Sequence, residues 1–255
     1  MRIIDTSSDF QSVYDDGKFN LDAWEIYIDR WIPNAKELCL CDMKDCINAG
    51  YSWDEDYVPV LNAVHTNHEK REETVRAFCE ISEHLEEKLT KVFGKSVDAD
   101  IVLYIGLCNG AGWVTKIQER TTVLLGIEKI IELDWCGKDD MIGLMIHELG
   151  HVYQSQYGSL SYQENSMAEK LLWQLFTEGV AMVFEQEIVG DAEYYHQNKN
   201  GWKEWCDQNY ELLKSSFCRD MTMMTQETQR YFGDWVRFED HSDVGYYLGA
   251  RFVRY

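Results

Sequence analysis

The stretch MIGLMIHELGHVYQ, residues Met141 to Gln154, contains two histidines four positions apart and a glutamate directly after the first. On a helix, residues four apart project from the same face, so His147 and His151 would lie one turn apart. Two imidazoles in that arrangement can hold one zinc ion. Glu148 is rotated by roughly 100° from His147, where it can reach a metal-bound water without binding the metal. The stretch therefore predicts a zinc-dependent hydrolytic site.

The plainer interpretation is an ordinary helix that contains His, Glu and His by chance, because a motif this short has false positives. The flanking residues argue against it, since MIGLMI precedes the motif and VY follows it. Such apolar flanks predict a core helix, and burying two histidines and a glutamate there without partners would be costly. We therefore interpret His147, Glu148 and His151 as a metal site.

A third ligand is needed, because catalytic zinc commonly has three protein ligands and one open position, and two histidines with one glutamate form a known set. The best candidate is Glu178 in LFTEGVAMVFE, where it interrupts a run of core-type residues. Gly179 beside it has no side chain and would let the Glu178 helix approach the HELGH helix closely. The alternative is a solvated glutamate on an amphipathic face, which is our expectation for Glu185 and Glu187.

The N-terminal third of the chain has a helical pattern. NLDAWEIYIDRWI has apolar residues at helical spacing and is followed by Pro33, which predicts the end of a helix. NHEKREETVRAFCEISEHLEEKLTKVFG predicts one long amphipathic helix that ends at Gly94. Its apolar face would consist of Val75, Phe78, Ile81, Leu85 and Leu89.

The pattern then changes to short β-branched runs, ADIVLYIGL and TTVLLGIEKI, with a Gly-rich turn and a possible short strand in CNGAGWVTKIQ between them. Helical spacing returns in SMAEKLLWQLFTEGVAMVFEQEIV, where Ser166 and Glu169 form a capping-box pair. WKEWCDQNYELLKSSF and SDVGYYLGARFVRY also predict helices. The expected fold class is α+β, mainly α, with a small mixed sheet. We divide it into a helical region 1–95, a region 96–190 with sheet, active-site helix and glutamate helix, and a helical region 191–255, together one catalytic unit.

Composition excludes several classes of partner. The formal net charge is −21. This charge disfavours binding to nucleic acid or to anionic membranes, because a protein binds either of them through a basic face. The first ten residues lack the apolar core of a secretory signal, and no apolar run reaches the roughly 18 residues that span a bilayer. Eight scattered cysteines are then expected to be reduced thiols in a cytoplasm. The cluster CLCDMKDC, from Cys39 to Cys46, does not have the paired spacing of structural zinc sites.

The motif HELGH, followed by EGVA at residues 178–181 and by GYYLG at 245–249, resembles the gluzincin metallopeptidases, in particular the peptidase-MA-like group. The resemblance covers residues 96–255. It implies a zincin-like catalytic unit, with a small sheet over the HExxH helix and a second helix that delivers Glu178. It also implies that the edge strand, in GAGWV, pairs with substrate backbone while TTVLLGI lies inside the sheet. Ala111, Gly112 and Trp113 would then face substrate, although Trp113 could instead belong to the core.

The resemblance implies zinc-dependent (Zn2+) hydrolysis of a peptide bond in a peptide or protein substrate, with Glu148 as general base. The negative charge that develops on the scissile carbonyl oxygen needs a hydrogen-bond donor besides zinc. We expect this donor after the helix that contains Glu178, and we favour Tyr246 over Tyr247 and His241. The alternative is a non-catalytic, zinc-stabilised helical binding protein or an inactive zincin homologue. His65 and His68 are expected in a solvated loop. The sequence specifies neither the cleaved sequence nor an oligomeric state.

Overall fold

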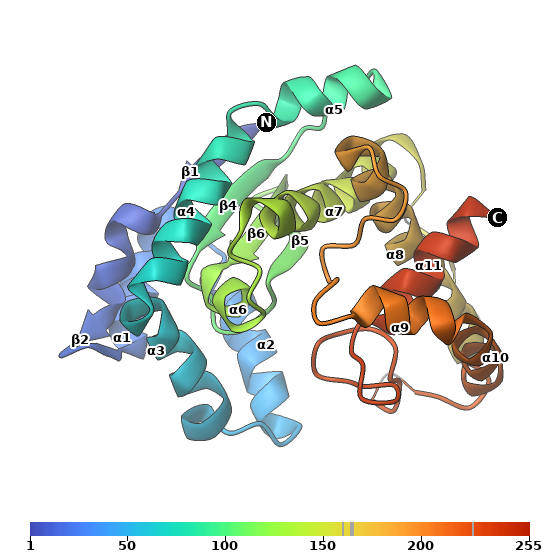
Figure 1. Ribbon diagram of the computed structural model, residues 1–255. Coiled ribbons are helices and arrows are strands. Elements are labelled where there is room, and N and C mark those ends of the chain that lie inside the picture. The colour runs from blue at the N-terminus through green and yellow to red at the C-terminus, as the bar shows by residue number, and fades with distance from the viewer. Residues whose placement is uncertain (160, 164–165, 226) are drawn as a thin grey trace. The chain divides into compact units, whose positions relative to one another are not determined.

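The computed structural model describes residues 1–159, 161–163, 166–225 and 227–255 (Figure 1). The chain divides into two compact units, Met1–Glu148 and Leu149–Tyr255. The division falls inside helix α7 (Lys138–Tyr157), which continues without a break from one unit into the other. It does not follow the predicted borders after residues 95 and 190.

The first unit contains a four-stranded mixed sheet, as the sequence predicted, in the order β1–β4–β6–β5. β1, β4 and β6 run parallel, whereas β5 at the edge runs antiparallel to β6. β4, β5 and β6 precede α7 in sequence. The sequence predicted strands there, because the spacing of apolar residues changes from helical to short β-branched runs before HELGH. The four strands are Arg2–Asp5 (β1), Asp100–Tyr104 (β4), Gly112–Ile117 (β5) and Arg120–Gly126 (β6).

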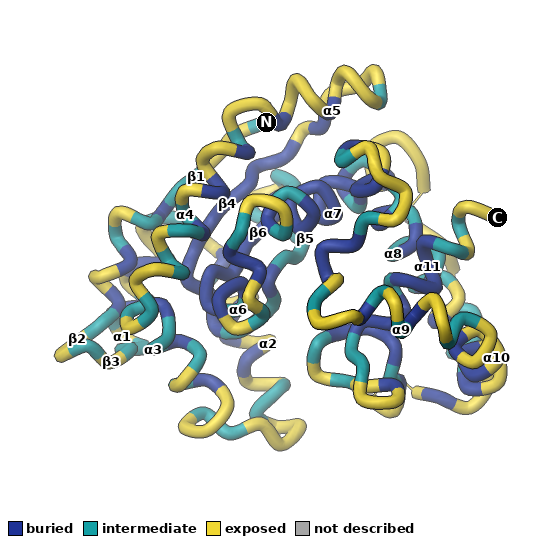
Figure 2. Tube along the Cα trace, viewed as in Figure 1, coloured by how far each residue is buried: buried dark blue, intermediate teal, exposed yellow. Residues whose placement is uncertain are grey.

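The two inner strands form the buried centre of this unit. All five residues of β4 are buried, and so are the last five of β6, which appear dark blue in Figure 2. TTVLLGIEKI is a strand only as far as Gly126, because the chain turns there into the short helix α6 (Ile127–Glu132). The prediction of one apolar strand through Ile130 was therefore too long.

The N-terminal third is not wholly helical, contrary to the prediction. It begins with β1, and a two-stranded hairpin follows, β2 (Tyr14–Asp15) and β3 (Lys18–Phe19). β1 is only four residues long, and it is a strand because it pairs with β4, almost one hundred residues later in the chain. Local hydrophobic period carries no signal for such a distant pairing.

The helices around this sheet are mostly amphipathic. Helix α1 (Leu21–Trp31) ends just before Pro33, as predicted, and its first turn is capped by the side chain of Asn20. Helices α3 (Val58–Thr66) and α4 (His68–Ser82) both pack against α6 (Figure 1). The other helical segments before β4 are η1 (Ser7–Val13), α2 (Lys36–Asn48), η2 (Trp53–Tyr57) and α5 (Leu85–Phe93).

The long helix predicted over residues 67–94 is in fact two helices, α4 and α5. The chain breaks at Glu83 and His84, and α5 then ends at Gly94 in the left-handed conformation that the sequence predicted. Leu85 and Leu89 continue the four-residue spacing of Ile81 across the break, and all three are buried. Apolar spacing alone therefore gave no sign of the interruption.

The second unit is helical. The predicted helix with Ser166 as cap is α8 (Met167–Val189), and the Ser166 hydroxyl accepts a hydrogen bond from the Glu169 backbone N–H at 3.2 Å. The two remaining helical predictions are also confirmed, although WKEWCDQNYELLKSSF is interrupted at Asn209. These helices are α9 (Trp202–Gln208), α10 (Tyr210–Asp220) and α11 (Val244–Arg254).

Glycines set how closely the helices of this unit approach. Gly179 lies against Gly249 of α11, and a Cβ atom at Gly179 would overlap the Gly249 carbonyl oxygen. The glycine that brings α8 to α7 is instead Gly150, inside HELGH, where an added Cβ would lie 3.0 Å from Cα of Ala181. The close approach predicted for Gly179 therefore exists, but its partner is α11 and not α7.

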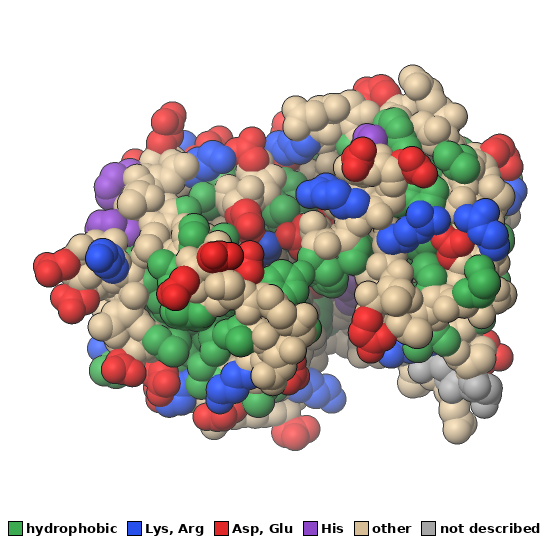
Figure 3. All heavy atoms as spheres, turned by 90° about the horizontal axis from the view of Figure 1, so that it is seen from below, with side chains coloured by type: hydrophobic (Ala, Val, Ile, Leu, Met, Phe, Trp, Pro, Cys, Tyr) green, Lys and Arg blue, Asp and Glu red, His purple; other side chains and the backbone are tan. Residues whose placement is uncertain are grey.

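Among the described residues, no helix combines the length and apolar character needed to cross a membrane. All eight cysteines are free, and Cys39, Cys136 and Cys206 are buried. On the face drawn in Figure 3, the acidic side chains are interspersed with Lys and Arg. The excess negative charge does not gather into a single acidic patch on that face.

Candidate metal centre

Helix α7 carries the two histidines and the glutamate of HELGH. Because α7 is a single uninterrupted helix from Lys138 to Tyr157, His147 and His151 lie one turn apart on one face. His147 and Glu148 are buried, and His151 is half-buried. Apolar residues such as Leu144 and Ile146 precede the motif and are buried too, so the prediction of a core helix is confirmed.

Helix α8 brings Glu178 to His151. Ala181, which contacts Gly150, lies one turn after Glu178 on α8, and Gly150 directly precedes His151 on α7. The Nε2 atom of His151 is consequently 3.3 Å from Oε2 of Glu178, and both side chains are less than one-fifth exposed. A partly buried position suits a ligand that must still meet water or substrate.

The distances fit a zinc ion. The ligand atoms of His147, His151 and Glu178 all lie within 4.8 Å of one another. Two ligands held about 2.0–2.1 Å from a tetrahedral ion are themselves about 3.3–3.4 Å apart, which is the separation found between His151 and Glu178. Two imidazoles and one carboxylate also form the donor set of catalytic zinc sites.

Strand β5 lies directly against Glu148 in the first unit. A Cβ atom added at Gly112, the first residue of β5, would lie 2.7 Å from Oε1 of Glu148 and 2.9 Å from Cδ1 of Leu144. Only glycine leaves room for the glutamate side chain at this point. GAGWV thus leads into the edge strand and TTVLLG forms the inner strand, as predicted, whereas contact with substrate stays a prediction.

Trp113 and Ala111 form hydrogen bonds with residues outside the HELGH segment. Successive residues of a strand point to opposite faces, so Trp113 points away from α7. Its indole N–H donates to the hydroxyl of Tyr104 at 3.0 Å, and Tyr104 is fully buried on that side. Ala111 is buried, and its carbonyl accepts a hydrogen bond from Gly126. Of the three predicted substrate-facing residues, Gly112 is the one whose position directly beside Glu148 is given by the packing.

Two of the three candidates for the oxyanion donor, Tyr247 and His241, already donate hydrogen bonds to other residues. Tyr247 is buried, and its hydroxyl donates to Oδ1 of Asp207 at 2.7 Å. His241 donates from Nδ1 to the carbonyl of Glu239 at 2.7 Å, and its ring stacks on Trp205.

Tyr246 is half-buried on α11. Its ring packs edge-on against Phe232, with ring centroids 5.9 Å apart. It precedes Gly249 by one turn, on the side of α11 that contacts α8. The role of Tyr246 as oxyanion donor stays a prediction.

Glu185 was predicted to be solvated, and this prediction was wrong. Its side chain is fully buried, whereas Glu187 is exposed, as expected. The two carboxylate oxygens of Glu185 accept hydrogen bonds from His196, one from the backbone N–H at 3.1 Å and one from Nδ1 at 2.9 Å. His147, Glu185 and His196 form a second group whose ligand atoms lie within 4.8 Å of one another. Glu185 follows Glu178 by two helical turns, so both lie on the same face of α8. This spacing could have indicated from the sequence that Glu185 lies near the predicted metal ligands.

His65 and His68 are not in a loop, contrary to the prediction. His65 belongs to the last turn of α3 and His68 is the first residue of α4, with only Asn67 between the two helices. Nδ1 of His65 lies 2.9 Å from the side-chain oxygen of Gln11, and Nδ1 of His68 accepts from Arg71.

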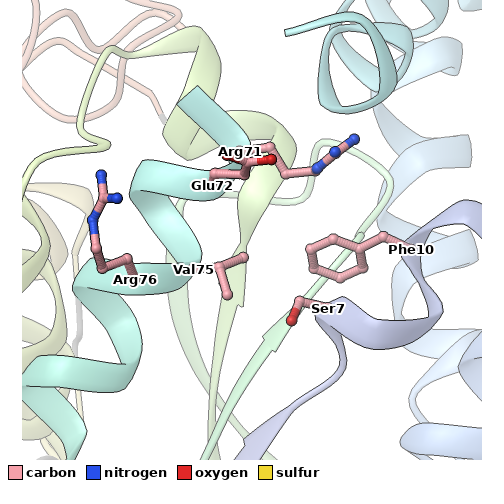
Figure 4. A pocket seen from close by; sticks show the side chains of 6 residues that line it. All are labelled: Ser7, Phe10, Arg71, Glu72, Val75 and Arg76. Atoms are coloured by element: carbon pink, nitrogen blue, oxygen red, sulfur yellow. The ribbon is translucent and has the colours of Figure 1, made fainter. Parts of the chain in front are cut away.

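A cavity of about 300 Å³ lies between η1 and α4 in the first unit. The guanidinium groups of Arg71 and Arg76 point away from each other in Figure 4, so the cavity does not present converging charges. Arg71 already donates to the Val64 carbonyl and to His68. The cavity is lined by Ser7, Phe10, Arg71, Glu72, Val75 and Arg76.

The chain was also compared with known proteins. A scan against protein-family models finds no match, and neither do searches of curated proteins and of solved structures.

Proposed function

We propose that this protein is a zinc-dependent hydrolase of peptide bonds, of the gluzincin type. The observation that carries the proposal is the approach of Glu178 to His151 at 3.3 Å, on the helix where His147 lies one turn earlier. A glutamate delivered from a second helix to an H-E-x-x-H pair is what the gluzincin resemblance implies. The sheet that precedes α7 and its edge strand β5 agree with a zincin-like unit.

Each residue then has a distinct role. His147, His151 and Glu178 would hold the zinc, which when bound lowers the pKa of water and polarises the scissile carbonyl. Glu148 takes a proton from the attacking water and passes it to the leaving amine. Glu185 is buried and accepts hydrogen bonds from His196 at both oxygens, so it has no step of its own in this reaction.

The substrate is a peptide or protein whose backbone pairs with β5. An edge strand has unpaired N–H and C=O groups on its outer side, and these can bind an extended peptide. Because Gly112 has no side chain, β5 lies close to Glu148, and a peptide paired with β5 would also lie near this glutamate. The eight free thiols agree with the cytoplasmic location expected from the sequence.

The proposal is tested by metal analysis together with a general peptidase assay. The purified protein should contain one zinc per chain and should cleave fluorescein-labelled casein. A chelator should stop cleavage, and added zinc should restore it. One zinc per chain without cleavage of any peptide library would instead favour a zinc-stabilised binding protein or an inactive zincin homologue. Absence of bound zinc at micromolar metal would contradict both.

Tyr246→Phe should lower kcat by roughly a hundredfold, the usual loss for one donor to a developing oxyanion. KM should hold, because the bond forms chiefly in the transition state. Zinc content should hold as well, because the hydroxyl is not a metal ligand. Steady-state kinetics and elemental analysis on the same preparation measure all three quantities.

Tyr247→Phe is the matched control for Tyr246→Phe, since it removes a hydroxyl from the next residue of α11. It should lower the melting temperature by a few degrees, because it breaks the hydrogen bond to Asp207, and leave kcat unchanged. If Tyr246→Phe keeps full kcat while Tyr247→Phe or His241→Ala loses it, the donor has been assigned to the wrong residue.

A further inference from the structure

Glu128 is a buried acidic residue on the first turn of α6, directly after β6, with no part in the proposed chemistry. It is fully buried, and both of its carboxylate oxygens accept hydrogen bonds from backbone N–H groups. Oε2 accepts from Gly106 at 2.9 Å, and Oε1 accepts from Cys108 at 3.2 Å. Both donors belong to the loop 105–111, which connects β4 to β5.

The surroundings of this carboxylate are built from glycines. A Cβ atom at Gly106 would lie 2.6 Å from Oε1 of Glu128, and one at Gly126 would lie 3.1 Å from the same oxygen. Larger residues at either position would displace the carboxylate or the loop. The loop also contains Cys108 at φ 56°, a left-handed conformation that a residue with a side chain adopts only with support from its surroundings.

The support comes from both ends of the loop and from its middle. The side chain of Asn109 accepts from Leu107 N and donates to the carbonyl of Cys39 and to Asp42. At the end of the loop, Ala111 accepts from Gly126 at 3.1 Å. The next residue is Gly112, which contacts Glu148. The loop that accepts support from Glu128 therefore leads directly into Gly112, the residue beside Glu148.

We propose that Glu128 is a positioning residue that fixes the start of β5, and so aligns the substrate-binding edge strand with Glu148. This inference rests on the proposed function, because it assigns β5 to substrate. An ionised carboxylate is suited to the task since it accepts at both oxygens, whereas an amide of the same shape accepts at only one.

The same geometry makes the alignment sensitive to pH. Burial raises the pKa of Glu128 to about 7, against the lowering effect of the Gly106 and Cys108 N–H groups, of its own N–H and of Lys129. A protonated carboxyl accepts more weakly at its hydroxyl oxygen than a carboxylate does, so protonation weakens one of the two bonds to the loop amides. The other titratable groups that interact with it are Tyr14, Tyr27, Cys39 and Tyr104, and burial raises the pKa of each so far that they stay neutral near pH 7.

The test compares Glu128→Gln with the wild type and with Glu132→Gln, which removes an exposed carboxylate from the same helix. In the wild type, KM for casein should rise as pH falls through about 7. Glu128→Gln should raise KM roughly three- to tenfold at pH 8 with kcat held, and its KM should no longer change between pH 6 and 8. Amide hydrogen exchange should increase in residues 105–117 and not in α7. Glu132→Gln should keep the wild-type KM at pH 8, a KM that rises at lower pH, and the wild-type exchange in residues 105–117.

The inference is overturned if the wild type is active while Glu128→Gln keeps the wild-type KM, pH profile or exchange in 105–117. Failure of the proposed function is recognised separately, because the wild type itself would then show no cleavage. If Glu128→Gln does not fold, Asn109→Ala releases the same loop from α2 instead of from α6. It should raise KM and loop exchange without removing the pH dependence, and unchanged values of both overturn the inference.

Discussion

Glu148→Gln is expected to retain zinc and to lose peptide hydrolysis. Gln has the same shape as Glu and cannot take up the proton of the attacking water, so a loss of about 10²–10⁴ in kcat follows from the usual contribution of a general base. Glu148 is not among the three residues grouped as metal ligands, so the zinc content should stay at the wild-type value. Elemental analysis and casein cleavage on one preparation measure both quantities.

The control is Glu187→Gln, which changes an exposed glutamate of α8 that forms an ion pair with Arg254. It should leave both zinc content and kcat unchanged, because a surface ion pair contributes little. Loss of zinc from Glu148→Gln, to the extent seen with His147→Ala, would show that Glu148 is a ligand and not the base. Retention of full activity would remove Glu148 from the mechanism.

The parts of the fold that follow from local spacing were predictable. α7 and α8 have continuous apolar spacing, and α8 also has a capping pair in Ser166 and Glu169. β5 and β6 are adjacent in sequence, and the turn between them is short. β1 was missed because four residues give almost no pattern, and its pairing partner β4 lies almost one hundred residues later in the chain.

The candidate site divides in the same way. His147, Glu148 and His151 are within one helical turn of each other, so their geometry follows from the helix alone. Glu178 was predicted to be a ligand because a charge in an apolar helix needs an explanation. The burial of Glu185 was missed because it depends on His196, in a segment after α8 that has no helical or strand pattern. Glu128 was missed because TTVLLGIEKI was interpreted as a strand through that position.

Gly179 shows how a correct observation can be assigned to the wrong partner. A glycine beside Glu178 indicates a close helix contact, and the HELGH helix was predicted to be its partner. The structure pairs Gly179 with Gly249, and pairs Gly150 of HELGH with Ala181. All four residues can be seen in the sequence, but only the three-dimensional packing decides which helices meet.

Glu178→Ala is expected to weaken zinc binding by more than the 10–100-fold typical of residues that only support a ligand. The reason is that Glu178 supplies one of three ligand atoms, and His151 would lose its neighbour at 3.3 Å. Activity should fall in proportion to the zinc lost. Because zinc binds the folded state, the melting temperature of the wild type should rise on zinc addition and fall with a chelator. In Glu178→Ala that difference should vanish.

The contribution of zinc to stability is separated from that of the side chain by comparing the chelated wild type with Glu178→Ala. Neither protein should hold zinc, so their melting temperatures should agree within a few degrees. Glu169→Ala is the matched control on α8, because Glu169 lies near the helix start and serves the cap. It should keep zinc. If Glu178→Ala binds zinc as the wild type does, the third ligand lies elsewhere, and Glu169→Ala and Glu185→Ala then decide between the remaining carboxylates. Unchanged zinc in all three variants would mean that no glutamate of α8 at these positions is a ligand, which contradicts a gluzincin centre.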